Sequence, residues 1–101
     1  MTYEVLLGAR TASIEETASA IAARLGVSFH KRDSHFYGDY FLAEIDQGEI
    51  SVVSQPDPEG EPLEEGFESY RTLVYIETEA DRPDLDQLAV ADEHLELLRD
   101  E

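Results

Sequence analysis

Hydrophobic and polar positions alternate with clear periods at the start of the chain. Tyr3 to Leu7 alternates with a period of two, which predicts a strand. The apolar positions that follow repeat every 3.6 residues and predict a helix. Ser13 and Glu16 form a capping box at its start, and Gly26 suits a left-handed stop. We expect one helical stripe to lie against a sheet: Ile14, Ala18, Ile21, Ala22 and Leu25.

The next part of the chain predicts two strands separated by a turn. Val27 to Arg32 is a short strand, and Asp33-Ser34 suits the turn. Phe36 to Ile45 is aromatic and typical of a strand, but its alternation changes parity at Gly38. The change indicates either a β-bulge or a two-residue turn, and a glycine within a strand pattern favours the bulge.

A hairpin, a long loop and a central strand follow. Asp46-Gln47-Gly48 predicts a tight turn into a strand from Glu49 to Ser54. Gln55 to Glu68 holds prolines and glycines among six acids, which predicts an exposed loop with little regular structure. Thr72 to Glu77 is apolar on both faces, and this pattern is typical of a central strand covered on both sides.

The C-terminal pattern supports two interpretations. One helical stripe continues over Leu85, Leu88, Ala91, Leu95 and Leu98, and a single long helix is the simpler prediction. The alternative is a helix that ends near Ala91, followed by a short strand at Leu95 to Leu98. Residues 1–101 therefore predict one α+β domain: a mostly antiparallel sheet of about five strands, an N-terminal crossover helix and a C-terminal helix packed on the sheet.

Composition fits such a domain. The chain has 101 residues, 42% of them hydrophobic, which is enough for one core. Cysteine is absent from the sequence, so disulfides and thiolate metal sites are excluded. No apolar run approaches the roughly 18 residues of a membrane span, and the first residues lack a basic signal-like region. We expect a cytoplasmic protein that binds no membrane.

The charge of the chain is strongly negative and unevenly distributed. Twenty-four acids against seven bases give a formal net charge of -17. Between Asp33 and Tyr70 there are eleven carboxylates and no lysine or arginine. Such a surface repels nucleic acid and anionic lipid and attracts basic proteins. A halophilic or GC-rich source would also explain acidity and a single lysine, but it predicts acids spread evenly along the chain.

No residue pattern points to catalysis or to a bound metal. The three histidines have irregular spacing for zinc, and we expect structural or solvated roles for His30, His35 and His94. In the acidic loop, prolines interrupt the alternating acids, and a twelve-residue calcium loop is absent. The sequence contains neither a glycine-rich phosphate loop nor a nucleophile elbow. We therefore expect no enzymatic activity and no cofactor.

The middle of the chain resembles a functional class. Three stretches carry the resemblance: Arg32 to Phe41, Gln55-Pro56-Asp57 and Tyr70 to Leu73. Together they resemble small acidic bacterial immunity proteins, which bind a secreted toxin and neutralise it. The resemblance implies a non-enzymatic inhibitor that covers the active site of a basic toxin, such as one acting on nucleic acid, without binding nucleic acid itself.

The predicted contact residues combine aromatic rings with acids. Tyrosine is enriched at binding hot spots, and Tyr37 and Tyr40 lie beside the acidic window, although packing within the sheet would also explain them. The predicted partner-binding set is Tyr37, Asp39, Tyr40, Asp57, Glu59, Glu61, Glu64, Glu65 and Glu68. The alternative function is an acidic DNA mimic that binds a cellular DNA-binding protein, which requires carboxylates spaced like phosphates.

Overall fold

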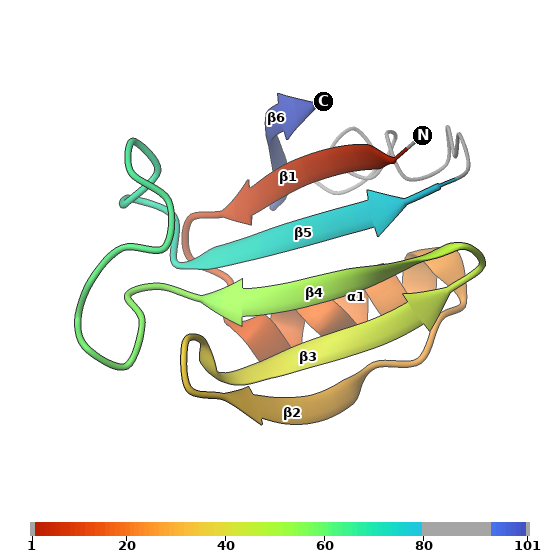
Figure 1. Ribbon diagram of the computed structural model, residues 1–101, viewed down its shortest axis with the longest axis horizontal. Coiled ribbons are helices and arrows are strands. Elements are labelled where there is room, and N and C mark those ends of the chain that lie inside the picture. Colours follow the sequence, from red (N-terminus) through yellow and green to blue (C-terminus); the bar gives the residue numbers. More distant parts are fainter. Residues whose placement is uncertain (1, 80–93, 101) are drawn as a thin grey trace.

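The computed structural model describes residues 2–79 and 94–100, which form an antiparallel sheet with a helix on one face (Figure 1). The elements are β1 (Tyr3–Ala9), α1 (Ile14–Leu25), β2 (His30–Ser34), β3 (Gly38–Ile45), β4 (Gly48–Ser54), β5 (Thr72–Thr78) and β6 (Glu96–Asp100). The strand order is β2-β3-β4-β5-β1-β6. The α+β class and the antiparallel sheet are confirmed, but the sheet has six strands instead of about five. No helix within the described residues is long and apolar enough to cross a membrane.

The start and end of α1 are as predicted. The Glu16 amide donates to Ser13 Oγ and the Ser13 amide donates to Glu16 Oε1, each over 3.1 Å. The hydrogen bonds from Ser13 lower the pKa of the Glu16 carboxyl. Gly26 follows the helix with φ 71°, a left-handed conformation that glycine adopts without steric cost.

The sheet has one face covered by α1 and one face turned away from it. Ile14, Ala18 and Ile21 of the helix are buried against the covered face. The strand residues of that layer are Val5, Leu7, Ala9, Ala43, Ile50, Val52, Val74 and Ile76. A smaller apolar cluster lies on the opposite face and is built on Leu6, Val53 and Leu73. Strand β5 lies between β4 and β1 and contributes residues to both clusters. Its prediction as a central strand is therefore confirmed.

The β2–β3 hairpin differs from the prediction. Val27 and Phe29 pack against the core before the strand begins, and β2 starts only at His30. The turn is formed by residues 35–37, not by Asp33-Ser34. Gly38, with φ 70°, pairs with Ser34 as the first residue of β3, and the pairing shows no register shift there. The predicted bulge was therefore wrong, because the left-handed glycine closes the turn instead of interrupting a strand.

The tight turn between β3 and β4 is confirmed. Ile45 pairs with Gly48, so Asp46 and Gln47 alone connect the strands, and Gln47 has φ 62°. A Cβ atom at Gly48 would overlap the backbone of Glu77 on β5. Glycine at this position therefore allows β4 to pair closely with β5 from its first residue.

The C-terminal strand corrects the preferred interpretation of the last residues. Glu96–Asp100 forms β6 and pairs antiparallel with β1, so a helix does not extend through Leu98. The alternative with a final strand is the better description of this segment. The predicted helical residues from Asp84 to Ala91 lie outside the described residues. The physical reason for β6 is the free edge of β1, which offers hydrogen-bond partners that a local period does not reveal.

The loop between β4 and β5 has no strand or helix, as predicted, but it is firmly attached. The buried Gln55 side chain donates to the carbonyls of Phe67 and Tyr70 over 2.8 and 2.9 Å. Its Oε1 accepts from the amides of Leu63 and Glu64 over 2.8 and 3.2 Å. One amide side chain thus substitutes for the regular hydrogen bonds that the loop lacks.

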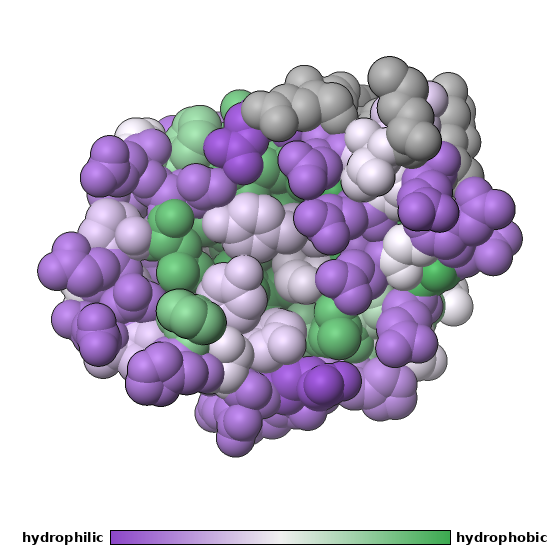
Figure 2. Space-filling model, viewed as in Figure 1, coloured by the Kyte–Doolittle hydropathy of each residue, from purple (hydrophilic) through white to green (hydrophobic). Residues whose placement is uncertain are grey.

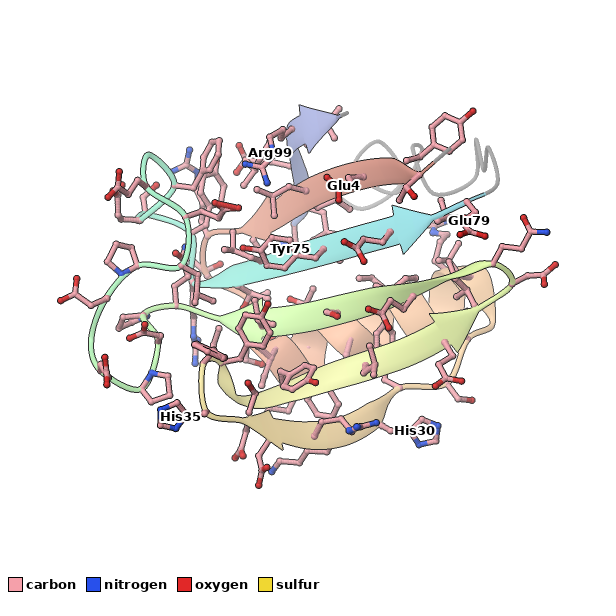
Figure 3. All side chains as sticks on the ribbon, viewed as in Figure 1. Glu4, His30, His35, Tyr75, Glu79 and Arg99 are labelled. Carbon is pink, nitrogen blue, oxygen red and sulfur yellow. The ribbon has the colours of Figure 1, made fainter. Side chains whose placement is uncertain are left out.

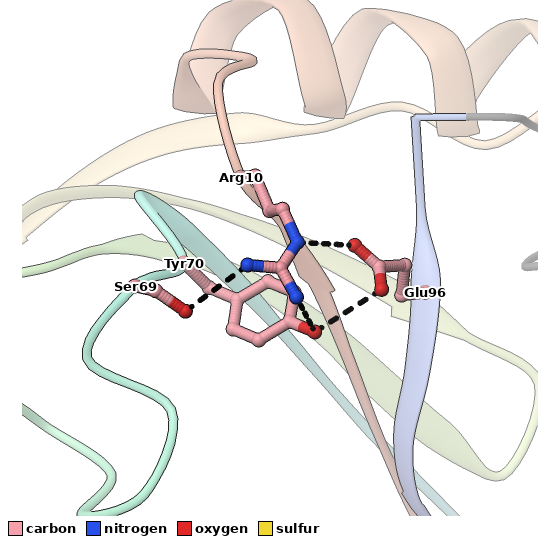
Figure 4. A network of polar contacts seen from close by, with 4 residues as sticks. All are labelled: Arg10, Ser69, Tyr70 and Glu96. Atoms are coloured by element: carbon pink, nitrogen blue, oxygen red, sulfur yellow. Dashed lines mark hydrogen bonds and ion pairs between the residues drawn. The ribbon is translucent and has the colours of Figure 1, made fainter.

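A second attachment joins the loop to β6 and to Arg10, the residue that follows β1 (Figure 4). The Tyr70 hydroxyl accepts from Arg10 Nη2 and donates to Glu96 Oε1, both over 3.1 Å. Arg10 Nε donates to Glu96 Oε2 over 3.0 Å, and the guanidinium lies 4.5 Å from the centre of the Tyr70 ring. The Arg10 Nη1 group also donates to Ser69 over 3.3 Å. These contacts place the loop over one end of the sheet face that α1 does not cover.

Candidate functional site

The face of the sheet away from α1, which we call the open face, carries acids in its middle and bases at its edges. Arg32 lies opposite Tyr40 on the edge strand β2, and Arg99 lies opposite Leu6 on the other edge strand, β6. Figure 2 views this face and shows weakly polar and hydrophobic residues over the central strands, with hydrophilic residues around and between them. The surface is therefore amphipathic rather than uniformly charged.

Four glutamates form a continuous row across the open face, which we call the glutamate row. Glu44 lies opposite Glu49, Glu49 opposite Glu77, and Glu77 opposite Glu4. All four side chains are exposed. Neighbouring strands are about 4.8 Å apart, so the row spans about 14 Å. Like charges directly opposite each other destabilise a sheet, so the fold carries this row at a cost.

An apolar and aromatic strip runs beside the glutamate row, on the same face and two residues away along each strand. In register, Leu42 lies opposite Ser51, Ser51 opposite Tyr75, and Tyr75 opposite Leu6. Tyr37 and Tyr40 add two rings in a T-shaped arrangement with centroids 5.4 Å apart. Both are partly buried in the smaller apolar cluster. Rigid rings beside a row of acids give the face both contact area and charge.

Between the two rows the open face contains a hollow of about 310 Å³. Its acids are Glu4, Glu49 and Glu77 of the glutamate row, and its rings are those of Tyr37 and Tyr75. The remaining lining residues are Val5, Leu6, Ser51, Ile76 and Arg99. Figure 3 shows Glu4, Tyr75 and Arg99 on the near side of the sheet, each projecting from a different strand.

One rim of the hollow is connected to the loop through Glu64. Arg99 Nη2 donates to Glu64 Oε1 over 3.0 Å. Burial, and then the charge of the Glu64 carboxylate and its hydrogen bond with the phenol, raise the pKa of Tyr75 well above its usual range. The Tyr75 hydroxyl is protonated at neutral pH and donates a hydrogen bond to the Glu64 carboxylate. This arrangement is suited to holding the rim in place.

The structure separates the predicted residues of the β2–β3 segment. Tyr37 and Tyr40 both lie on the open face, and Tyr37 lines the hollow. Asp39 has the opposite parity to Tyr40 along β3 and therefore points to the other side. Its carboxylate lies 3.7 Å from Lys31 Nζ, in an exposed ion pair. The structure thus joins Tyr37 and Tyr40 but does not bring Asp39 to the same surface.

The predicted loop acids fall into two groups. Three already have hydrogen-bond partners. Within the loop, Asp57 accepts from the amides of Glu59 and Glu61, and Glu68 accepts from the amide of Gly66. Glu64 accepts from Arg99 on β6. The hydrogen bonds from Gly66 and from its own amide lower the pKa of the Glu68 carboxyl. The other three are exposed and have no side-chain partner among the described residues: Glu59, Glu61 and Glu65.

The sequence interpretation missed the glutamate row and Tyr75. Each of these glutamates is next to a core residue along its strand, as Glu49 is next to Ile50, and this alternation was visible in the sequence. Their alignment was not visible, because it depends on the register of four strands from three separate parts of the chain. The alternation of each strand therefore identifies the four glutamates as outward-facing, but it does not show that they lie side by side.

The described residues offer no metal centre. No group of three or more His, Asp or Glu side chains within residues 2–79 and 94–100 could hold a metal ion. His30 is exposed on an edge strand, His35 is exposed in a turn, and neither lines the hollow.

No protein-family model matches the chain, and no curated protein matches it.

Proposed function

We propose that this chain is a non-enzymatic binding protein, an immunity-type inhibitor that neutralises a basic toxin by covering its active site with the open face. The observation that carries the proposal is the glutamate row beside an aromatic strip, on a face that α1 leaves uncovered. Interface centres are typically aromatic, and complementary charge sets partner choice and the rate of encounter.

The energetics of the row support a binding role. Glu49 and Glu77 each face two like charges across the neighbouring strands, which costs stability without any compensating base in the row. A basic partner would turn this repulsion into attraction on binding. General acidity of the halophilic kind predicts acids spread over the surface and does not predict acids aligned across neighbouring strands.

The exposed loop acids extend the same negative surface. Glu59, Glu61 and Glu65 are exposed, and the loop that carries them is attached to the end of the open face through Gln55 and Tyr70. We assign them to steering a basic partner toward the face, because exposed charges act mainly on the association rate.

The test is inhibition of a defined enzyme. The purified chain captures proteins from its source at low salt, and each basic enzyme recovered is then assayed with and without stoichiometric chain. The row variant Glu49→Gln with Glu77→Gln is compared with a control of equal charge on the other side of the sheet, Glu15→Gln with Asp33→Asn. We expect inhibition of one enzyme, lost in the row variant and retained in the control.

Two outcomes contradict the proposal. If no basic enzyme is inhibited, the chain is not an inhibitor of this kind. If many unrelated DNA-binding proteins are released from duplex DNA, the chain is a DNA mimic. The row fits DNA poorly. Its four carboxylates are about 4.8 Å apart and span about 14 Å in total, whereas one DNA strand carries a phosphate about every 3.4 Å along the axis.

A further inference from the structure

The hollow in the open face has the chemistry of a receptor for a single cationic side chain. Three strands bring one carboxylate each to it, Glu4 from β1, Glu49 from β4 and Glu77 from β5. Against them stands the single guanidinium of Arg99, which already donates to Glu64. Three negative charges and one positive charge leave two negative charges in the lining.

The aromatic side of the hollow distinguishes between cations. Tyr37 and Tyr75 line it and both are partly exposed, so part of its surface is aromatic. A guanidinium is planar, stacks on aromatic rings, and can bond to a carboxylate through two parallel N–H groups. An ammonium is a compact, strongly hydrated charge that gains less from such a surface.

We propose that the hollow receives an arginine side chain of the partner protein, and that this arginine is the anchor of the complex. The inference rests on the proposed function, because it assumes that a basic protein covers the open face. The carboxylates of Glu49 and Glu77 bind the guanidinium, and the Tyr75 ring packs against its plane. Tyr40 and Leu42, which lie beside the hollow, contact the residues next to the arginine.

A side chain from a protein fits this site better than a small free cation. The hollow is open, so one cation binds weakly without contacts beyond it, whereas a partner chain also covers the strip of Leu42 and Tyr40. The described residues form no metal-binding group, which leaves the organic cations. The volume of about 310 Å³ is at the low end for ligand pockets. It is large enough for one side chain together with bound water.

The experiment uses three short peptides that differ only at the central residue: Ac-Leu-Arg-Leu-amide, its lysine analogue and its uncharged citrulline analogue. Each is titrated into the full chain at low salt, and amide chemical shifts are followed by NMR. We expect the arginine peptide to bind most tightly, with shifts at Leu6, Tyr75 and Glu77. The citrulline peptide should not bind measurably.

Variants separate the proposed contacts from general acidity. Tyr75→Leu keeps an apolar side chain but removes the ring, and it should lower the affinity for the arginine peptide about two- to fivefold. Glu77→Gln should lower the affinity for both charged peptides. Glu15→Gln, which removes the same charge from α1 on the other side, should change neither affinity. The NMR spectrum of each variant also shows that it is folded.

Equal binding of the arginine and lysine peptides, unaffected by Tyr75→Leu, would overturn the inference and indicate diffuse attraction only. If neither peptide binds but the chain still inhibits a basic enzyme through the glutamate row, the hollow is not the anchor and the proposed function stands. If the arginine peptide binds as expected but no enzyme is inhibited, the hollow is an arginine site and the inhibitor function fails.

Discussion

The two faces of the sheet use the same strands in opposite ways. On the covered face, Ile50, Val74 and Val5 are buried in the same apolar layer as the inner side of α1. On the open face, the adjacent positions Glu49, Tyr75 and Glu4 remain partly or fully exposed. Because side chains alternate along a strand, one residue step separates a position selected for stability from one available for binding. The difference predicts that truncating a side chain on the open face costs the fold less than truncating one on the covered face.

The largest effect is expected on the covered face. Ile50→Ala removes a fully buried side chain beneath α1 and should lower the free energy of unfolding by about 2 to 5 kcal/mol. Leu42→Ala, the control on the open face, removes a half-buried side chain and should cost less than about 1 kcal/mol. Urea denaturation measures both. Equal losses would contradict the distinction between the two faces.

The part of the open face under the loop should show an intermediate effect. Tyr70→Phe keeps the buried ring but removes the hydroxyl that links Arg10 to Glu96. Arg10 and Glu96 retain their direct ion pair and are about half exposed, so water can replace the lost partner. We expect a loss of about 1 kcal/mol. The same urea titration tests it, and a loss as large as that of Ile50→Ala would mean that the attachment of the loop carries part of the core's stability.

The glutamate row should respond in the opposite direction, by gaining stability. Glu77 faces Glu49 and Glu4, whereas Glu4 faces only Glu77 within the row. Glu77→Gln should therefore stabilise the fold by a few tenths of a kcal/mol, and by more than Glu4→Gln does. Both gains should shrink in about 1 M salt, where the Debye length is near 3 Å. Denaturation at low and high salt measures the difference, and a loss of stability in both variants would show that the row is a structural element.

The three exposed loop acids should affect association more than stability. Replacing Glu59, Glu61 and Glu65 by glutamine removes charges without side-chain partners among the described residues. If the chain binds a basic protein as proposed, the association rate of that protein should fall at low salt, with little change in dissociation. Stopped-flow or surface kinetics at two salt concentrations provides the measurement. Unchanged rates at low salt would confine recognition to the open face itself.

The last effect is confined to alkaline solution and is expected at Tyr75. The folded state holds the Tyr75 pKa above the unfolded value of 10.0, so above this pH the unfolded chain binds fewer protons than the folded chain. Stability from this group is complete below pH 10 and is lost as the pH rises beyond it. Tyr75→Phe should therefore show a shallower alkaline decline in urea midpoint than the parent chain. An identical decline in both would mean that the phenol is freely solvated.

The sequence by itself determined the local elements whose signals lie within a few residues. The capping box of Ser13 and Glu16, the stop at Gly26 and the turn before Gly48 were readable because their hydrogen bonds and backbone angles are local. The two-sided apolar pattern of Thr72 to Glu77 likewise placed β5 in the centre of the sheet.

Only the tertiary structure decided how distant segments align. Leu95 to Leu98 fits a helical and an extended period alike, and pairing with the free edge of β1 selects the strand. The glutamate row depends on the register of β3, β4, β5 and β1, and a shift of one residue in any strand would send its glutamate to the other face. Cross-strand register is a property of the assembled sheet, so composition revealed the acidity of this protein and the fold alone placed it.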